Sequence, residues 1–143
     1  MKQEDKDLLM KDLCMRLPYG VKGIITFNGD KDIFTVKGII NILFLSDTEC
    51  CHVEDFKPYL IPISSMTEEQ LDELKEYSGL KYSASLLELV NWTDECTTLE
   101  FWLEETPADI IIKVFDWLNR NHFDYRDLIT RGLAIDCTNL NIY

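Results

Sequence analysis

Hydrophobic residues near the N-terminus recur at helical spacing. From Glu4 to Arg16 the apolar positions fall three or four residues apart between charged ones; they are Leu9, Met10, Leu13 and Cys14, with Leu17 next in the series. This spacing gathers them on one face and predicts an amphipathic helix over residues 4–16. The sequence LPYG (17–20) follows, and its proline and glycine are expected to end the helix.

The pattern then changes to that of β-strands. The segments VKGIITF (21–27) and KDIFTVKGI (31–39) are rich in Val, Ile, Phe and Thr, and they flank Asn28-Gly29. Both turn residues accept the positive φ of a type I′ turn, so a β-hairpin is predicted. NILFLS (41–46) is expected to be a third strand, buried on both faces. KPYLIPISSM (57–66) contains two prolines and is interpreted as an extended connection, not a central strand.

Capping signals predict helices in the second half of the chain. Ser65 and Glu68 have capping-box spacing ahead of an apolar repeat that ends near Gly79. Thr106 is the expected N-cap of another helix, with Pro107 as its first residue and an apolar face made by Ile110, Ile111, Val114, Phe115 and Leu118. A short helix is expected to begin at Asp124. Residues 82–105 fit both helix and strand, and both alternatives stay open.

These elements predict an α+β fold. The expected arrangement is a single domain over residues 1–143, with an N-terminal helix, an antiparallel β-meander and C-terminal helices packed on one face. A hydrophobic fraction of 46% and a charged fraction of 28% are typical of soluble globular proteins. The longest apolar run is far too short to span a bilayer, and the N-terminus is charged, so no membrane association and a cytoplasmic location are expected.

The charge distribution constrains the class of partner. The chain has a net charge of −12, and residues 63–105 contain eleven acidic but only two basic residues. Binding to nucleic acid requires a concentrated basic surface, so direct binding to DNA or RNA is not expected. A basic protein partner is favoured instead. The six glycines do not form a phosphate-binding motif, and no cofactor is expected.

The segment DTECCHVEDF (47–56) has the composition of a metal or thiol site. In an extended segment Cys50 and His52 share one face while Cys51 lies on the other. A structural zinc site needs four convergent ligands, so the fold would have to supply Cys96, Cys137 or His122. The surrounding acids also disfavour a reactive thiolate. We therefore interpret these cysteines as reduced core residues and expect no metal and no catalytic residue.

A second polar cluster lies near the C-terminus and comprises His122, Asp124, Tyr125, Arg126 and Asp127. Its members have simple structural interpretations. Asp124 caps a helix, Asp127 reciprocates at the third helical position, Tyr125 packs, and Arg126 is solvated or paired.

Acidic residues of the helix that follows Ser65 recur at i, i+4 spacing and form two rows. They are Glu68, Glu69, Asp72, Glu73 and Glu76. The ordinary interpretation is a solvated face. The functional alternative is a docking surface for a basic protein. The carboxylates of one row rise by ~6 Å per step, a spacing that would imitate a row of phosphates.

Three motifs resemble a family of small proteins from gut-dwelling bacteria and their phages or prophages. They are LCMRLPYGV (13–21), KPYLIPISSMTEEQ (57–70) and DWLNRNHFDYRDLITRGLAI (116–135). The resemblance implies a mobile-element origin. The family has no established activity, cofactor or catalytic residue, so the resemblance transfers no site. This chain has Asp127 where the family pattern has glycine.

The sequence thus favours a non-enzymatic interaction or accessory protein. The first alternative is an acidic inhibitor that mimics nucleic acid and binds a host DNA-binding protein. A thiol or metal-dependent enzyme is the more distant alternative.

Overall fold

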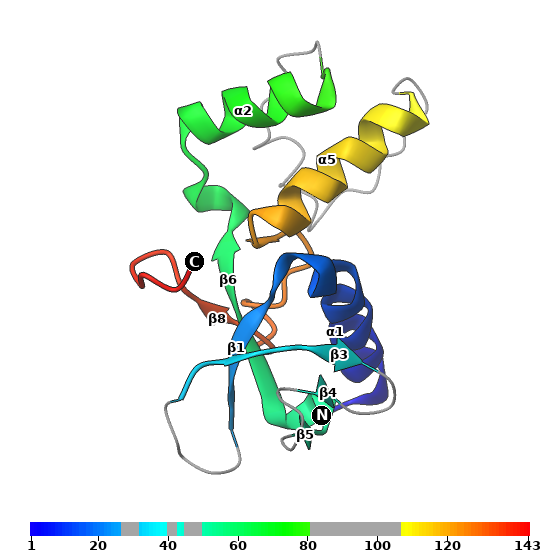
Figure 1. Cartoon of the computed structure of the whole chain (residues 1–143), viewed down its shortest axis with the longest axis vertical. Helices are drawn as coiled ribbons and strands as arrows, with labels where there is room; N and C mark the ends of the chain where they lie inside the picture. The colour runs from blue at the N-terminus through cyan, green and yellow to red at the C-terminus, as the bar shows by residue number, and fades with distance from the viewer. Residues whose placement is uncertain (27–31, 40–42, 45–49, 81–106) are drawn as a thin grey trace.

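A computed structural model describes residues 1–26, 32–39, 43–44, 50–80 and 107–143. The predicted turn at Asn28-Gly29, the segment 82–105 and the cap at Thr106 lie outside this part of the chain. Within it, an N-terminal helix, a mixed and mostly antiparallel sheet, and two later helices that pack together form one α+β domain (Figure 1). The predicted fold class is confirmed.

Helix α1 spans Gln3–Arg16, as its apolar repeat predicted. A 3-10 turn over Leu17–Tyr19 follows, and Gly20 ends it with a φ of 72°. Leu9 and Leu13 are fully buried against the sheet. Two charged residues of the same face are also fully buried, which the apolar pattern did not indicate.

Antiparallel pairs account for the first half of the chain. Strand β1 (Lys22–Ile25) pairs with β2 (Phe34–Thr35), and the register of Lys22 with Thr35 is the one that a two-residue turn at 28–29 requires. The predicted pairing of these segments is confirmed. Strands β3 (Gly38–Ile39), β4 (Leu43–Phe44) and β5 (Cys50–Cys51) then form an antiparallel meander.

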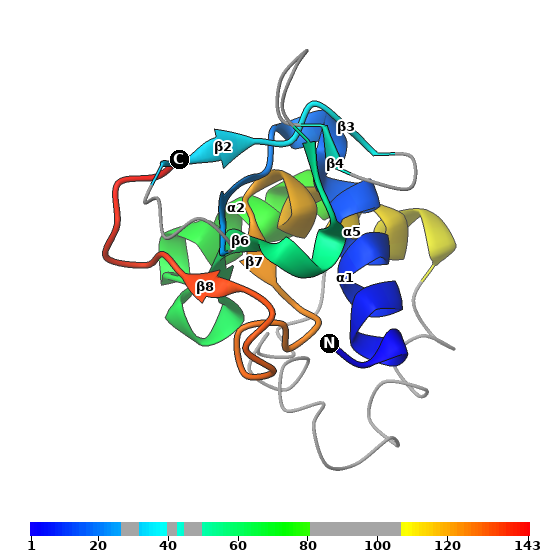
Figure 2. The ribbon, with the colours of Figure 1, turned by 90° about the horizontal axis from the view of Figure 1, so that it is seen from below.

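Strand β6, Phe56–Pro62, is the central strand of the larger sheet. It pairs antiparallel with β1 and parallel with both β7 (Phe123–Asp124) and β8 (Ile135–Asp136); Figure 2 shows β8 beside it. The interpretation of residues 57–66 as a connection was therefore wrong. Pro58 is the last residue paired with β1, and Pro62 is the last of the strand. Each proline stands where a run of pairing ends, so a missing N–H costs little there.

The described residues form two hydrophobic clusters. One lies between α1 and the sheet and includes Leu9, Leu13, Val21, Phe56, Leu60 and Leu128. The other joins helices α2 (Glu68–Ser78) and α5 (Ala108–Arg120) to β7. Its members include Leu74, Val114, Trp117, Leu118 and Phe123, and the rings of Trp117 and Phe123 stack with centroids 5.6 Å apart. Phe123 thus connects the helical pair to the strand beside β6.

The ends of the helices differ in part from the prediction. The cap of α2 is Thr67, which forms a capping box with Gln70, whereas Ser65 lies in a 3-10 turn and donates to the Pro62 carbonyl. Gly79 ends α2 in left-handed backbone, as predicted. In α5, Pro107 is the N-cap and not the first helical residue. The TEEQ sequence has the same S/T-x-x-E/Q spacing as the predicted box, so spacing alone could not separate the two.

The close approach of β1 to β6 requires glycine at position 23. A Cβ built on Gly23 would lie 2.5 Å from Phe56 Cζ and closer still to the Lys57 carbonyl oxygen. We expect Gly23→Ala to lower the free energy of unfolding by about 2–3 kcal/mol, because a backbone carbonyl cannot move aside as a flexible side chain would. Urea denaturation would measure this loss.

Gly79→Ala provides a control. Gly79 has a φ of 77° but open space around its Cα. Its replacement should cost about 1 kcal/mol through backbone strain alone. Equal losses at the two positions would contradict the steric argument for Gly23.

Candidate functional site

The predicted acidic face is fully presented to solvent. All five of its residues are exposed: Glu68, Glu69, Asp72, Glu73 and Glu76. Leu74 on the other side of α2 is fully buried against α5. The two helices lie side by side at one end of the molecule (Figure 1). Among the described residues, Lys75 offsets one charge of this face. Its Nζ lies 3.6 Å from Asp72 Oδ1.

The cysteines do not converge in the described part of the chain. Cys50 is exposed and Cys51 half-buried, so the two thiols lie on opposite faces of β5 as alternation predicted. Cys137 is buried after β8, and Cys96 lies outside the described residues. Burial raises the pKa of both the Cys51 and the Cys137 thiol to about 11, which keeps them protonated and weakly nucleophilic at neutral pH.

The described residues contain no cluster of metal ligands. Across the described ranges, no three side chains of His, Cys, Asp or Glu gather closely enough to hold an ion. His52 is exposed beside β5, whereas His122 is buried beside β6. The structure therefore does not bring His122 and Cys137 into a ligand set with Cys50 and His52.

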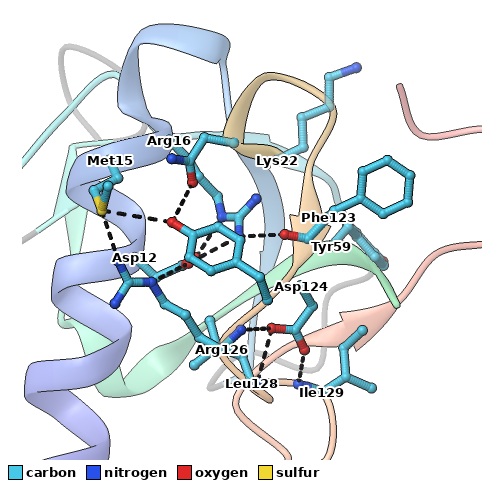
Figure 3. Close-up of polar contacts among 12 residues, drawn as sticks. Asp12, Met15, Arg16, Lys22, Tyr59, Phe123, Asp124, Arg126, Leu128 and Ile129 are labelled. Atoms are coloured by element: carbon cyan, nitrogen blue, oxygen red, sulfur yellow. Dashed lines mark hydrogen bonds and ion pairs between the residues drawn. The ribbon is translucent and has the colours of Figure 1, made fainter. Parts of the chain in front are cut away.

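Asp124 caps a turn and not a helix. Its carboxylate accepts backbone N–H groups from Arg126 and Leu128 at 3.1 Å and from Ile129 at 2.8 Å (Figure 3). The helix expected from Asp124 is absent, because residues 123–124 pair with β6 and the chain then turns. Asp127 does not reciprocate as a cap: it is exposed and has a left-handed φ of 59°. The predicted capping role of Asp124 holds in a different local structure.

A buried ion pair on α1 is the largest feature that sequence reasoning missed. Arg16 Nε donates to Asp12 Oδ2 at 2.7 Å and Arg16 Nη2 to Asp12 Oδ1 at 3.0 Å, with both side chains fully buried. Arg16 Nη2 also donates to the Phe123 carbonyl at 2.7 Å, which ties α1 to β7 (Figure 3). A signal was available: Asp12 and Arg16 fall at i+3 and i+7 from Leu9, within the apolar stripe.

Arg126 and Tyr125 extend this pair to the C-terminal region. Arg126 Nε lies 3.4 Å from Asp12 Oδ1, so two guanidinium groups share one buried carboxylate. Both cations lie over the Tyr125 ring, Arg16 at 5.3 Å and Arg126 at 5.0 Å from its centroid. The Tyr125 hydroxyl donates to Asn119 Oδ1 on α5 at 2.9 Å. The predicted roles of Tyr125 in packing and of Arg126 in pairing are confirmed, and the network's evident role is structural.

His122, next to this network in the sequence, contacts Tyr143. Its ring stacks on Tyr143 with centroids 3.6 Å apart, and the Tyr143 hydroxyl donates to the Tyr59 carbonyl at 3.0 Å. Lys22 donates from Nζ to the Ile142 carbonyl at 2.6 Å. Burial, with the nearby charges of Arg16 and Lys22, lowers the pKa of His122 to about 4. The imidazole is therefore neutral at pH 7 and is held by stacking, with Nδ1 unpaired among the described residues.

Removal of the Asp12 charge should destabilise the fold strongly. We expect Asp12→Asn to lower the free energy of unfolding by about 3–5 kcal/mol, because it leaves the fully buried Arg16 cation without its counter-charge. Urea denaturation would measure the loss. Arg131→Gln is the control, since Arg131 is exposed and its pair with the half-buried Asp5 should contribute little.

The double variant Asp12→Leu with Arg16→Met should recover much of that loss, because removal of both charges avoids an unpaired buried ion. A double variant as unstable as Asp12→Asn would indicate that shape, and not charge, governs this site.

Protonation of His122 should couple stability to pH. The folded pKa of about 4 lies below the ordinary value of 6.5, so the unfolded chain binds the proton more readily between these values. Stability should therefore fall as the pH decreases from about 6.5 to about 4, by up to about 3 kcal/mol from this group.

The measurement is denaturation at several pH values with His122→Asn as the comparison, because asparagine accepts the positive φ at this position. The difference in stability between the two proteins should narrow with acidification. Parallel pH profiles would show that His122 does not titrate in this way.

Comparison with protein-family models, with curated proteins and with solved structures found no match to this chain. In the described part of the chain, none of the helices has the length and apolar content to cross a bilayer. Among the described side chains, the five carboxylates of the acidic face of α2 are all exposed.

Proposed function

We propose that this protein is a non-enzymatic interaction or accessory protein that binds a basic protein partner through the acidic face of α2. The face consists of Glu68, Glu69, Asp72, Glu73 and Glu76. One observation carries the proposal: every one of these carboxylates is exposed, on a helix whose opposite side is buried against α5. The fold thus holds the acids outward on a supported helix.

Electrostatics favour a basic partner. Like charges at i, i+4 repel each other, and Lys75 offsets one of the five charges among the described residues. A cationic surface placed against the helix would relieve this repulsion. The net charge of −12 would also attract a basic protein over a distance and accelerate its association at low ionic strength.

The resemblance to proteins of gut bacteria and their phages supports the proposal that a mobile element encodes this protein. In that setting a small acidic protein would act on a host or element-encoded partner. The resemblance names no partner, so its contribution is the genetic context alone.

A binding experiment with charge-matched variants tests the proposal. The first variant replaces Glu68, Asp72 and Glu76 with lysine. The control replaces Glu4, Asp7 and Asp32 with lysine as well. These residues are exposed and lie outside α2, so the net charge of both variants changes equally. Immobilised wild-type protein should retain a basic protein from a native lysate, the α2 variant should lose it, and the control should keep it. Retention by the α2 variant would contradict the proposal.

The same experiment identifies a nucleic-acid mimic. If the retained partner binds DNA, duplex DNA should compete with this protein for the partner. The DNA concentration needed for competition should rise with salt, because contacts to phosphate weaken. A partner that binds DNA and this protein together would exclude mimicry while keeping the acidic docking surface.

A further inference from the structure

Two tyrosines from distant segments converge on one carboxylate near the acidic face. Tyr19, in the 3-10 turn after α1, donates its hydroxyl hydrogen to Asp116 Oδ1. Tyr77, near the end of α2, donates to Asp116 Oδ2 at 2.6 Å. Asp116 belongs to α5, so three elements meet here. These hydrogen bonds fix both phenol rings beside a single negative charge.

Arg120 already occupies this arrangement, but loosely. Its guanidinium carbon lies 5.8 Å from the centroid of Tyr19 and 5.3 Å from that of Tyr77. Its Nη2 is 3.9 Å from Asp116 Oδ2, which is an ion pair beyond hydrogen-bond length, and 53% of the side chain is exposed. The geometry therefore accepts a guanidinium over two rings, yet the resident one makes no close contact with the carboxylate.

The cluster is continuous with the acidic face. Tyr77 directly follows Glu76 and lies one helical turn after Glu73. Tyr77 itself is 39% exposed. A basic segment that lies along α2 would thus reach the two tyrosines at the end of the acidic rows.

We propose that Tyr19, Tyr77 and Asp116 form a binding site for an arginine side chain of the basic partner, which displaces Arg120. The inference rests on the proposed function of the acidic face, and it specifies the partner's chemistry. Arginine is preferred over lysine because a planar guanidinium can stack on an aromatic ring while it pairs with a carboxylate.

Synthetic peptides test the site directly. Hexa-arginine amide and hexa-lysine amide are titrated into the wild-type protein and into Arg120→Ala, with binding measured by isothermal calorimetry. Loss of the resident cation should strengthen hexa-arginine binding by about threefold to tenfold and hexa-lysine binding by much less. Lys113→Ala is the matched control, because it removes one exposed positive charge from the same helix outside the cluster.

Two outcomes separate this inference from the function on which it rests. If Arg120→Ala leaves the ratio of the two peptide affinities at its wild-type value, as Lys113→Ala should, the arginine site is overturned. If lysine replacements at Glu68, Asp72 and Glu76 leave hexa-lysine binding unchanged, the acidic face fails instead. Tyr77→Leu combined with Arg120→Ala should abolish the gain in arginine preference, and persistence of that gain would also overturn the site.

Discussion

The buried pair of Asp12 and Arg16 holds the two ends of the chain together. Arg16 donates two hydrogen bonds to Asp12 within α1. It also donates one to the Phe123 carbonyl, beside the central strand. Transfer of both charges from water is costly, so the pair is stable only when these hydrogen bonds are made, while Arg16 Nη1 has no partner among the described residues. That condition is also a constraint. Helix α1 can pack in full only when the C-terminal region is in place, and Phe123 then links this region to the helical pair that bears the acidic face.

Local signals carried much of the fold. The apolar repeat of α1, the pairing around Asn28-Gly29 and the glycine at the end of α2 each reflect interactions between residues near in sequence. The central position of β6 could not be inferred in this way. Its prolines counted against a paired strand, and its parallel partners lie far along the chain. Only the pairing of the whole sheet decides whether a proline stands at the end of a hydrogen-bond ladder, where its missing N–H is tolerated.

The same distinction applies to the candidate site. Exposure of the acidic residues followed from their spacing against Leu74, since a helix can bury only one side here. The burial of Asp12 and Arg16 had one sequence signal: two charged residues occupy positions of the apolar repeat, where hydrophobic residues are expected. The convergence of Tyr19 and Tyr77 on Asp116 had no sequence signal, because contacts among three separate elements leave no periodic trace.

The pairing of β6 bears on how the protein emerges from the ribosome. Its antiparallel neighbour β1 is synthesised before it, but β7 and β8 follow about sixty to eighty residues later. Contacts so distant in sequence slow folding, since a long loop must close before they form. During translation the second half of β6 is made before β7 and β8, its described partners on that side, and until they follow, it presents an open edge to them. A nascent chain stalled before residue 123 would therefore expose this β-edge, which is a site for non-native pairing with another chain.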